Sequence, residues 1–199
     1  MRDKDSLTKA VKISNPKTLD FQVARTSLLP GILKTIASNK NMPLPLKLFE
    51  ISDVVVKDDN YGIEFSNLSS SFLSEILIFF FIPCPSIVDA DVRARNERYL
   101  SAIYYHKNSG FEIIHGLLDR IMQVLEIPMK TNESTNTTVG YYYYLRAKND
   151  PRFLNNRCAE VLINEQIIGI IGVVHPEVVG NFELAMPCSA LELSIQNIY

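Results

Sequence analysis

Two strands joined by a very short turn constrain this chain more than any other feature. Residues 158–163 (CAEVLI) and 166–174 (QIIGIIGVV) are rich in β-branched side chains, and only Asn164 and Glu165 separate them. A polar two-residue link between two such runs is typical of a β-hairpin. The sequence therefore predicts an antiparallel pair of strands, around which the rest of the fold must be arranged.

The second strand of this hairpin is expected to be central in its sheet. Its apolar residues occupy both alternating faces, with Ile167, Ile171 and Val173 on one and Ile168, Ile170 and Val174 on the other. A strand with one face in water would alternate apolar and polar residues instead. Gly169 and Gly172 fall on opposite faces, and glycine inside a strand usually marks a bulge or the close approach of another element.

The remaining elements predict an α+β fold with a mainly antiparallel sheet. His175, Pro176 and Glu177 begin a helix after the hairpin, because proline suits the first helical turn and glutamate suits the positive end of the helix dipole. Further helices are expected at residues 27–38 and 110–127, and further strands at 46–56, 99–105, 140–147 and 190–195. Strands joined by hairpin-length links, with helices between groups of strands, favour α+β over a parallel arrangement.

The helix at residues 110–127 has one apolar stripe. The side chains expected to be buried are Phe111, Ile114, Leu118, Ile121 and Leu125. Toward the other side lies His115, with Glu112 and Asp119 at helical spacing, and a solvated helix face gives the same pattern as a catalytic pair. We therefore interpret this group as solvated surface.

Composition indicates a globular protein without the charge of an autonomous nucleic-acid binder. Hydrophobic residues make up 47% of the 199 residues and charged residues 21%, while the net charge is -2 and the pI is near 5.9. Cys84, Cys158 and Cys188 are odd in number and widely spaced, which favours reduced thiols and a cytosolic, cytoplasmic location. The charged N-terminus, MRDKDSLTK, does not have the apolar core of a signal peptide.

No complete catalytic, cofactor-binding or metal-ligating set emerges from the residues. His175 has only Glu177 nearby, so a structural role before the helix-starting proline is favoured over catalysis. Gly169 and Gly172 lie within a strand and do not form a phosphate-binding loop. The tyrosines at 141–144 could stack on bases, but a strand with two aromatic faces is the favoured interpretation.

Three stretches together closely resemble one known family. They are residues 15–39 (NPKTLDFQVARTSLLPGILKTIASN), residues 46–56 (LKLFEISDVVV), and the pair GFEIIHGLLDRIMQVL and RCAEVLINEQIIGIIGVVHPEVVGNFEL. In order and spacing they are similar to the C-terminal catalytic-like module of the β subunit of cytosolic phenylalanine tRNA synthetase. The resemblance implies a single domain over residues 1–199, with a class II synthetase-like antiparallel β-sheet flanked by helices.

The resemblance also implies that this module is truncated and non-catalytic. A class II site uses arginines to grip ATP, one on the strand after the RTSLLPG-like segment and one in a late glycine-rich turn. This sequence reads Phe49-Glu50-Ile51 at the first place and Ala190-Leu191-Glu192-Leu193 at the second. We expect no catalytic, cofactor or metal residues here, with ATP and magnesium used only by the full α/β enzyme.

Partners are likewise implied by the resemblance. They are the synthetase α subunit, in a heterotetramer, and tRNA in the full complex, with no membrane. The expected work is to structure the α subunit and help position tRNA during attachment of phenylalanine. The candidates for the subunit interface are Arg25, Leu28, Leu29 and Ile32. The alternatives are a free-standing, non-catalytic interaction module or an unstable truncated product; an autonomous enzyme is disfavoured.

Residues 64–92 depart from the family pattern. The run at 76–82 is continuously apolar and ends at Pro83, and it is too short to span a bilayer. Arg93 stands where the family has glycine. The segment FFFIPCPS fits translation of a pyrimidine-rich run ending at AG, like the end of an intron. We therefore interpret 64–92 as an atypical insertion, either a retained intron or a disordered loop.

Overall fold

The computed structural model describes residues 10–18, 22–57, 94–130 and 141–198 of the chain. The segment at 64–92 and most of the Asn/Thr-rich stretch at 130–138 lie outside the described residues. The helices and strands are α2 (Leu29–Ser38), β1 (Leu46–Lys57), β2 (Ala94–Tyr105), α4 (Phe111–Val124), β3 (Tyr143–Ala147), β4 (Phe153–Ile163), β5 (Gln166–Val174), α5 (Pro176–Asn181), β6 (Cys188–Ser194) and the short 3-10 turn η3 (Gln196–Ile198).

The described residues form an α+β fold with a six-stranded antiparallel sheet, as the sequence predicts. The spatial order of the strands is β1-β2-β6-β5-β4-β3. β5 is therefore a central strand, with β4 on one side and β6 on the other, and both pairings are antiparallel.

The chain divides into two compact units. One consists of residues 1–4, 27–53 and 98–199 and contains the helices named above and most of the sheet, and the other consists of residues 5–26 and 54–97. In the second unit, Lys12 and Val23 form an antiparallel bridge, and the Val55 amide donates to the carbonyl of Arg25 at 2.9 Å. The expectation of one domain over residues 1–199 stays a prediction.

The predicted hairpin is confirmed as β4 and β5. Asn164 and Glu165 form its turn with φ of 46° and 69°, the left-handed values that a two-residue type I′ turn requires. β4 begins at Phe153, five residues before the predicted start, and its pairing with β5 is irregular between Phe153 and Cys158. The apolar pattern of the sequence did not predict the start of β4, because the residues between Phe153 and Cys158 are exposed.

Gly169 marks a bulge in β5, which changes one predicted face. Val161 pairs with Gly169 while Leu162 pairs with Ile167, so Ile168 is left over between them. The side chain of Ile168 consequently packs with Ile171 beneath α4, and its predicted position beside Ile170 is wrong.

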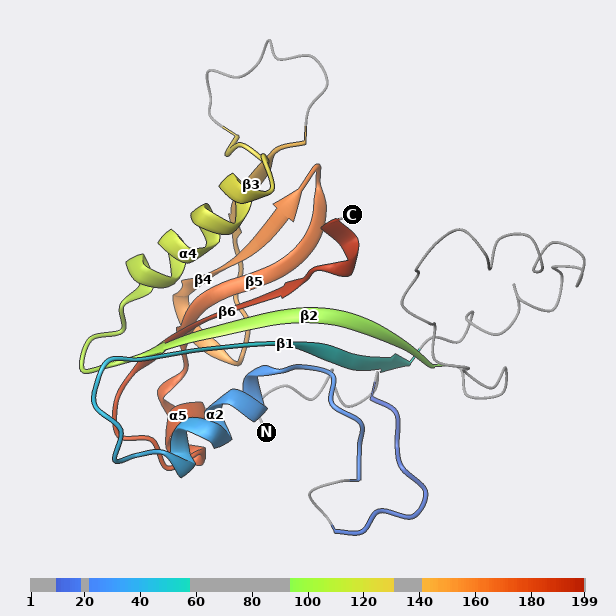
Figure 1. The fold of residues 1–199 in the computed structure, drawn as a ribbon, viewed down its shortest axis with the longest axis vertical. Helices are drawn as coiled ribbons and strands as arrows, with labels where there is room; N and C mark the ends of the chain where they lie inside the picture. The colour runs from blue at the N-terminus through green and yellow to red at the C-terminus, as the bar shows by residue number, and fades with distance from the viewer. Residues whose placement is uncertain (1–9, 19–21, 58–93, 131–140, 199) are drawn as a thin grey trace, which may run out of the picture. The chain divides into compact units, whose positions relative to one another are not determined.

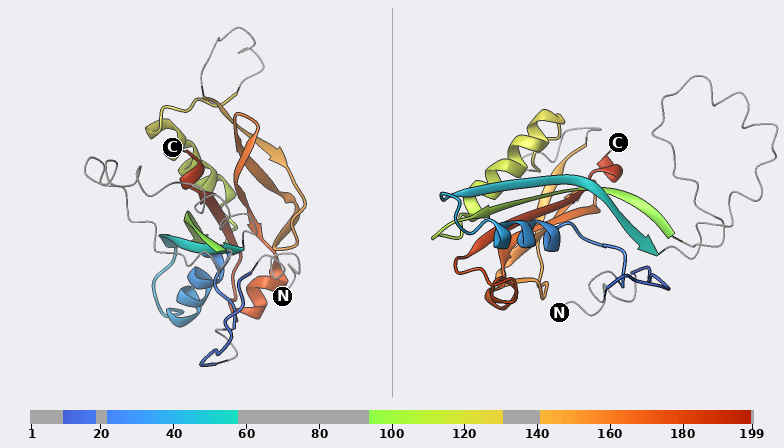
Figure 2. Two further views of the ribbon diagram at one scale, coloured as in Figure 1. Left: turned by 90° about the vertical axis from the view of Figure 1, so that its right-hand side faces the viewer. Right: turned by 60° about the horizontal axis from the view of Figure 1, so that its bottom comes forward.

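Two layers of helix cover the sheet in the larger unit. α2 and α5 lie on one face and α4 lies on the opposite face (Figures 1 and 2). The first face buries Leu33 and Ile36 of α2 and Val179 of α5, and the second buries Leu118 and Met122 of α4. Each such buried aliphatic side chain stabilises the fold by roughly 1.5–3 kcal/mol.

The helices differ from prediction mainly at their edges. α2 begins at Leu29, two residues after the predicted start, and α4 ends at Val124. In α4, the fully covered residues are Ile114, Leu118 and Met122, while the predicted Phe111, Ile121 and Leu125 are only partly buried. Met122 was missed because its side chain falls just outside the predicted stripe.

Candidate functional site

A buried glutamate joins the last strand to the first helix. Glu192 of β6 is 5% exposed, and its Oε1 accepts hydrogen bonds from the Ser27 hydroxyl at 2.8 Å and the Leu28 amide at 2.8 Å. The Leu29 amide also donates to it, at 3.4 Å. These amides are at the start of α2, where no residue of the helix itself can accept their hydrogens. Glu192 therefore caps α2 and places negative charge at the positive end of its dipole.

Arg152 completes the Glu192 cluster. Its Nη1 lies 3.5 Å from Glu192 Oε2, and its Nη2 lies 2.9 Å from Asp150 Oδ2. Burial alone would raise the pKa of Asp150, but the hydrogen bonds and charge of Arg152 outweigh burial and lower it. In this cluster the positive charge of Arg152 pairs with the negative charges of Asp150 and Glu192.

Glu50 of β1 and Glu192 of β6 both lie near the first turn of α2. A Cβ on Gly31, in the first turn of α2, would lie 3.6 Å from Glu50 Oε2, and Glu192 caps the same turn. Two carboxylates in this place give it a negative charge. The arrangement supports helix anchoring and offers no cation to an anionic substrate from these two strand positions.

The interface candidates lie on or next to α2. Leu28, Leu29 and Ile32 are buried at 1–3% exposure within the chain's own core, while Arg25 is exposed. Their assignment to a subunit contact stays a prediction.

His175 is the N-cap residue of α5. Its extended backbone precedes Pro176, and its Nδ1 accepts a hydrogen bond from the Glu177 amide at 3.1 Å. The structural role favoured by the sequence is confirmed, because this nitrogen is used in ending the strand and starting the helix.

His115 and Asp119 belong to a partly buried group, so the prediction of a simple solvated face is wrong here. Their side chains are 3.1 Å apart on α4, and the Tyr143 hydroxyl donates to Asp119 Oδ1 at 2.8 Å. Burial and this hydrogen bond raise the pKa of Tyr143 to about 12. Sequence reasoning missed the link because Tyr143 and Asp119 come from different elements.

Tyr143 should make the free energy of unfolding depend on pH above about 10. Its pKa is higher in the fold than the ordinary 10.0, so the neutral phenol stabilises the fold below pH 10.0, and this stabilisation is lost as the pH rises through about 12. The shift corresponds to roughly 2–3 kcal/mol. Urea unfolding measures the free energy of unfolding at about pH 9 and about pH 11.5. Between these two pH values it should fall more for the unchanged chain than for Tyr143→Phe. Equal falls would contradict this.

Cys158 and Cys188 are buried free thiols, and burial raises the pKa of each to about 12. They should not react with a thiol reagent such as DTNB at about pH 8, because the thiolate is the nucleophile. A Cys84→Ser background limits the assay to these two thiols. Reaction of both should appear when urea unfolds the chain; rapid reaction in the folded chain would show that the thiols are accessible.

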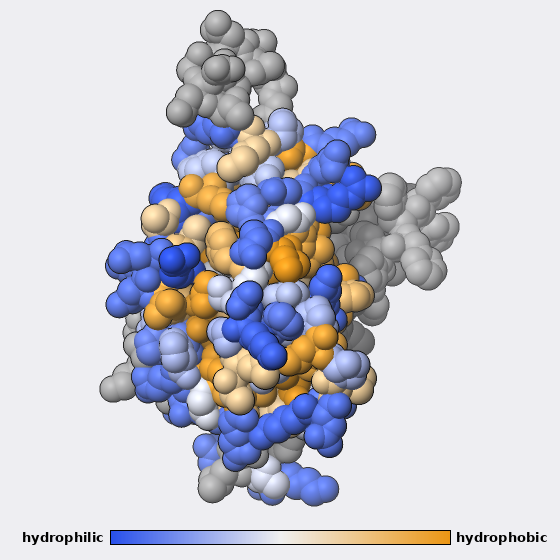
Figure 3. Space-filling view, turned by 90° about the vertical axis from the view of Figure 1, so that its left-hand side faces the viewer, coloured by the Kyte–Doolittle hydropathy of each residue, from blue (hydrophilic) through white to orange (hydrophobic). Residues whose placement is uncertain are grey.

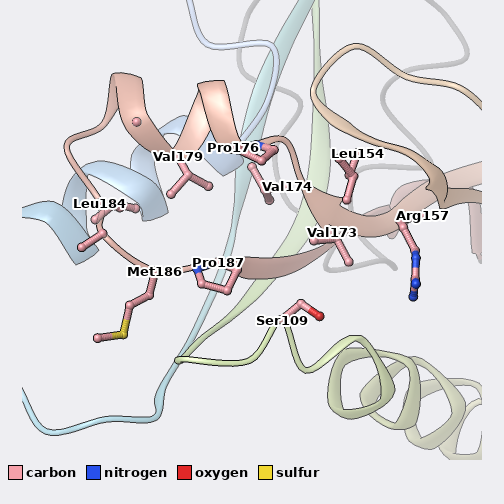
Figure 4. Close-up of a pocket in the computed structure, with 12 residues that line it drawn as sticks. Ser109, Leu154, Arg157, Val173, Val174, Pro176, Val179, Leu184, Met186 and Pro187 are labelled. Carbon is pink, nitrogen blue, oxygen red and sulfur yellow. The ribbon is translucent and has the colours of Figure 1, made fainter.

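A cavity of about 590 Å³ lies between α5, the end of β5 and residues 184–187 (Figure 4). Its lining is mostly apolar and includes Val174, Val179, Leu184 and Pro187, while Arg157 lies at one side. Volumes of this size occur in small-molecule sites. The lining contains no carboxylate, histidine or cysteine, so it offers no acid–base pair or thiol nucleophile.

The described residues contain neither a membrane-spanning helix nor a candidate metal centre. None of the helices there is long and apolar enough to cross a membrane. In the same part of the chain, no three His, Cys, Asp or Glu side chains are grouped so that they could hold a metal ion.

Comparison with known proteins places the chain in a family. The model of the phenylalanyl tRNA synthetase beta chain CLM domain matches residues 1–195. The phenylalanine–tRNA ligase beta subunit of Homo sapiens is 50% identical over 96% of this chain and 26% of its own length. The subunit of Caenorhabditis elegans is 44% identical over 98% of the chain and 27% of its own length.

A plant relative extends the same similarity. The cytoplasmic phenylalanine–tRNA ligase beta subunit of Arabidopsis thaliana is 38% identical over 100% of the chain and 29% of its own length. The chain thus spans little more than a quarter of the length of these relatives. With the family model matching nearly every residue, this chain belongs to the phenylalanyl tRNA synthetase beta chain CLM domain family.

Proposed function

We propose that this chain is a non-catalytic module of class II synthetase type that serves phenylalanine–tRNA ligase as part of its β subunit. The observation that carries the proposal is the use of Glu192. Its carboxylate is occupied by the amides of α2, Ser27 and Arg152, at a position where a catalytic copy would present a cation to ATP. In this proposal the side chain at the strand position that would bind ATP in a catalytic copy stabilises the fold instead.

The ATP and magnesium of the reaction then belong to the assembled α/β enzyme. Charge stabilisation at a transferring phosphate needs preorganised cations, and Glu50 and Glu192 have the opposite sign. A cytoplasmic location is proposed with this role, and the similarity to the cytoplasmic subunit of Arabidopsis thaliana supports it.

The proposed partners are the α subunit and, in the complete enzyme, tRNA. Exposed apolar side chains support a protein partner: Phe49 and Ile51 on β1 are 74% and 52% exposed, and Val124 on α4 is 67% exposed. On the face drawn in Figure 3, apolar residues lie among hydrophilic ones, a mixture suited to a subunit contact.

The α2 segment is proposed as part of that contact, with Arg25, Leu28, Leu29 and Ile32 as its candidates. Because the three aliphatic side chains are buried, their part would be to hold α2 in place. Direct contact would then come from exposed α2 positions such as Lys34 and Thr35.

Co-purification tests this function. The chain and the α subunit, mixed and separated by size exclusion, should elute together, and the chain alone should give no ATP–pyrophosphate exchange. A folded chain that elutes apart from the α subunit would instead favour a free-standing interaction module. Exchange by the isolated chain would contradict the non-catalytic assignment.

We also propose that residues 1–199 act as one domain interrupted by an insertion at 64–92, encoded by a retained intron. The continuous apolar run at 76–82 supports the idea, because it follows neither a strand nor a helix period. Sequencing the transcripts decides the matter: a minor message containing these codons is expected, and a dominant one would rule the retained intron out.

A further inference from the structure

Two aromatic side chains and then two basic ones lie on one face of the edge strand β3 and of the residues that flank it. Tyr142, Tyr144, Arg146 and Lys148 are two residues apart, so they share one face, and same-face neighbours are about 6.6 Å apart in a strand. Tyr143, between them, turns to the opposite face and is buried under α4. Lys130 lies beside the two tyrosine rings, and these five residues are called the β3 row.

The tyrosines of the β3 row are held in a fixed arrangement. Their ring centroids are 6.3 Å apart with planes inclined at 30°. The Lys130 ammonium lies 4.8 Å from the Tyr142 centroid and 5.3 Å from the Tyr144 centroid. Both hydroxyls donate to the Glu165 carboxylate, and the bond from Tyr144 is the first cause of a lowered pKa of Glu165.

Two cations of the β3 row, Arg146 and Lys148, pair with a buried carboxylate on the neighbouring strand β4. The buried Glu160 carboxylate accepts from Arg146 Nη2 at 2.7 Å and from the Lys148 ammonium, yet Arg146 and Lys148 remain 52% and 44% exposed. Burial alone would raise the pKa of Glu160, but these bonds outweigh it and lower the pKa. Glu160 itself is 7% exposed, so the surface above it presents positive charge to solvent.

These observations indicate which kind of ligand the β3 row is suited to bind. Ordered aromatic rings beside exposed cations are what unpaired bases and phosphates require. The centre of a protein–protein interface is depleted of lysine, whereas the β3 row contains Lys130 and Lys148. β3 is the last strand of the sheet order, and its Tyr143 forms backbone hydrogen bonds with Pro128 and Lys130.

We propose that the β3 row binds RNA with unpaired bases, which stack on Tyr142 and Tyr144 while Lys130, Arg146 and Lys148 contact phosphates. This inference rests on the proposed function, since tRNA is the RNA that such a subunit would meet, and it names the surface that would meet it.

Fluorescence anisotropy with labelled decauridine tests the proposal. The purified chain should bind the single strand more tightly than a blunt duplex RNA of equal length. Tyr142→Leu combined with Tyr144→Leu should weaken binding at least about tenfold, because each stacked base is lost. Lys130→Gln should weaken binding and reduce the slope of log K against log salt by about 0.7.

Lys40→Gln is the matched control. Lys40 pairs with Glu183 at 3.3 Å and is 47% exposed, closely similar to Lys130, which lies 3.6 Å from Glu165 and is 51% exposed. This variant should bind as the unchanged chain does. Circular dichroism should confirm that each variant is folded, and the single change at Lys130 provides a second test if the double variant is not.

Three outcomes would overturn the proposal: no saturable binding of decauridine up to about 100 μM, equal binding of single strand and duplex, or unchanged binding in the folded variants of the β3 row. Co-elution with the α subunit separates this result from the proposed function. The tyrosine double variant should still co-elute. RNA binding by a chain that does not co-elute with the α subunit would support RNA binding by the β3 row and reject the subunit role. Co-elution without RNA binding would reject only RNA binding by the β3 row.

Discussion

Gly169→Ala should destabilise the fold by at least about 3 kcal/mol, a large effect for one methyl group. A Cβ on Gly169 would lie 2.6 Å from Leu193 Cδ2 and 2.9 Å from Leu193 Cα, and closer still to the carbonyl oxygen of Glu192. Two of these atoms are backbone atoms of the adjacent strand β6, so the strain cannot be relieved by turning a side chain. Urea unfolding, with the free energy extrapolated to water, measures the loss.

Gly116→Ala is the control for the same chemical change. Gly116 lies within α4, and nothing is within 4 Å of the position where its Cβ would be. Alanine in an open helix position should stabilise the fold by about 0.5–1 kcal/mol. The two glycines should therefore give shifts of opposite sign. A loss below about 1 kcal/mol for Gly169→Ala would contradict the close packing of β5 against β6.

Glu192→Ala should be the second large effect, about 3 kcal/mol. The change leaves the Leu28 amide without its acceptor and removes one of the two carboxylates that contact the partly buried Arg152, and buried groups that lose a charged partner carry a cost of desolvation. For a chain of this length, the melting temperature should fall by roughly 6–12 °C. Glu192→Gln keeps one acceptor oxygen and loses the charge. Its melting temperature should lie between those of the unchanged chain and Glu192→Ala.

Glu183→Ala is the matched control for Glu192. Glu183 also pairs with a cation, Lys40 at 3.3 Å, but its side chain is 85% exposed. Exposed ion pairs contribute about 0–1 kcal/mol, so little change is expected. Equal melting temperatures for Glu192→Ala and the unchanged chain would show that α2 does not depend on the carboxylate.

Local features of the fold were predictable from sequence, and distant pairings were not. The β4–β5 hairpin could be predicted because its turn and both strands are adjacent in the chain, and the His175 cap because proline follows it directly. The side of the sheet taken by Ile168 could not, because one extra residue in a bulge reverses the alternation after it.

The candidate sites show the same limit. The sequence shows Glu192, but not the use that the fold makes of it, because Ser27 is 165 residues away from it. Of the tyrosine run at 141–144, which was predicted to lie in a strand, only Tyr143 and Tyr144 belong to β3. The cations of the β3 row became evident only when Lys130 was brought beside Tyr142 and Tyr144.

The order of strands has a consequence for synthesis on the ribosome. Of these six strands β6 is made last, yet it lies between β2 and β5. Translation at about 5–20 residues per second puts roughly 4–18 seconds between the completion of β2 and that of β6. β2 has an edge without its final partner throughout that time, and β5 has one from its own completion until β6 is made; open edges invite pairing with other chains. A nascent chain paused before β6 should therefore be the species most dependent on chaperones.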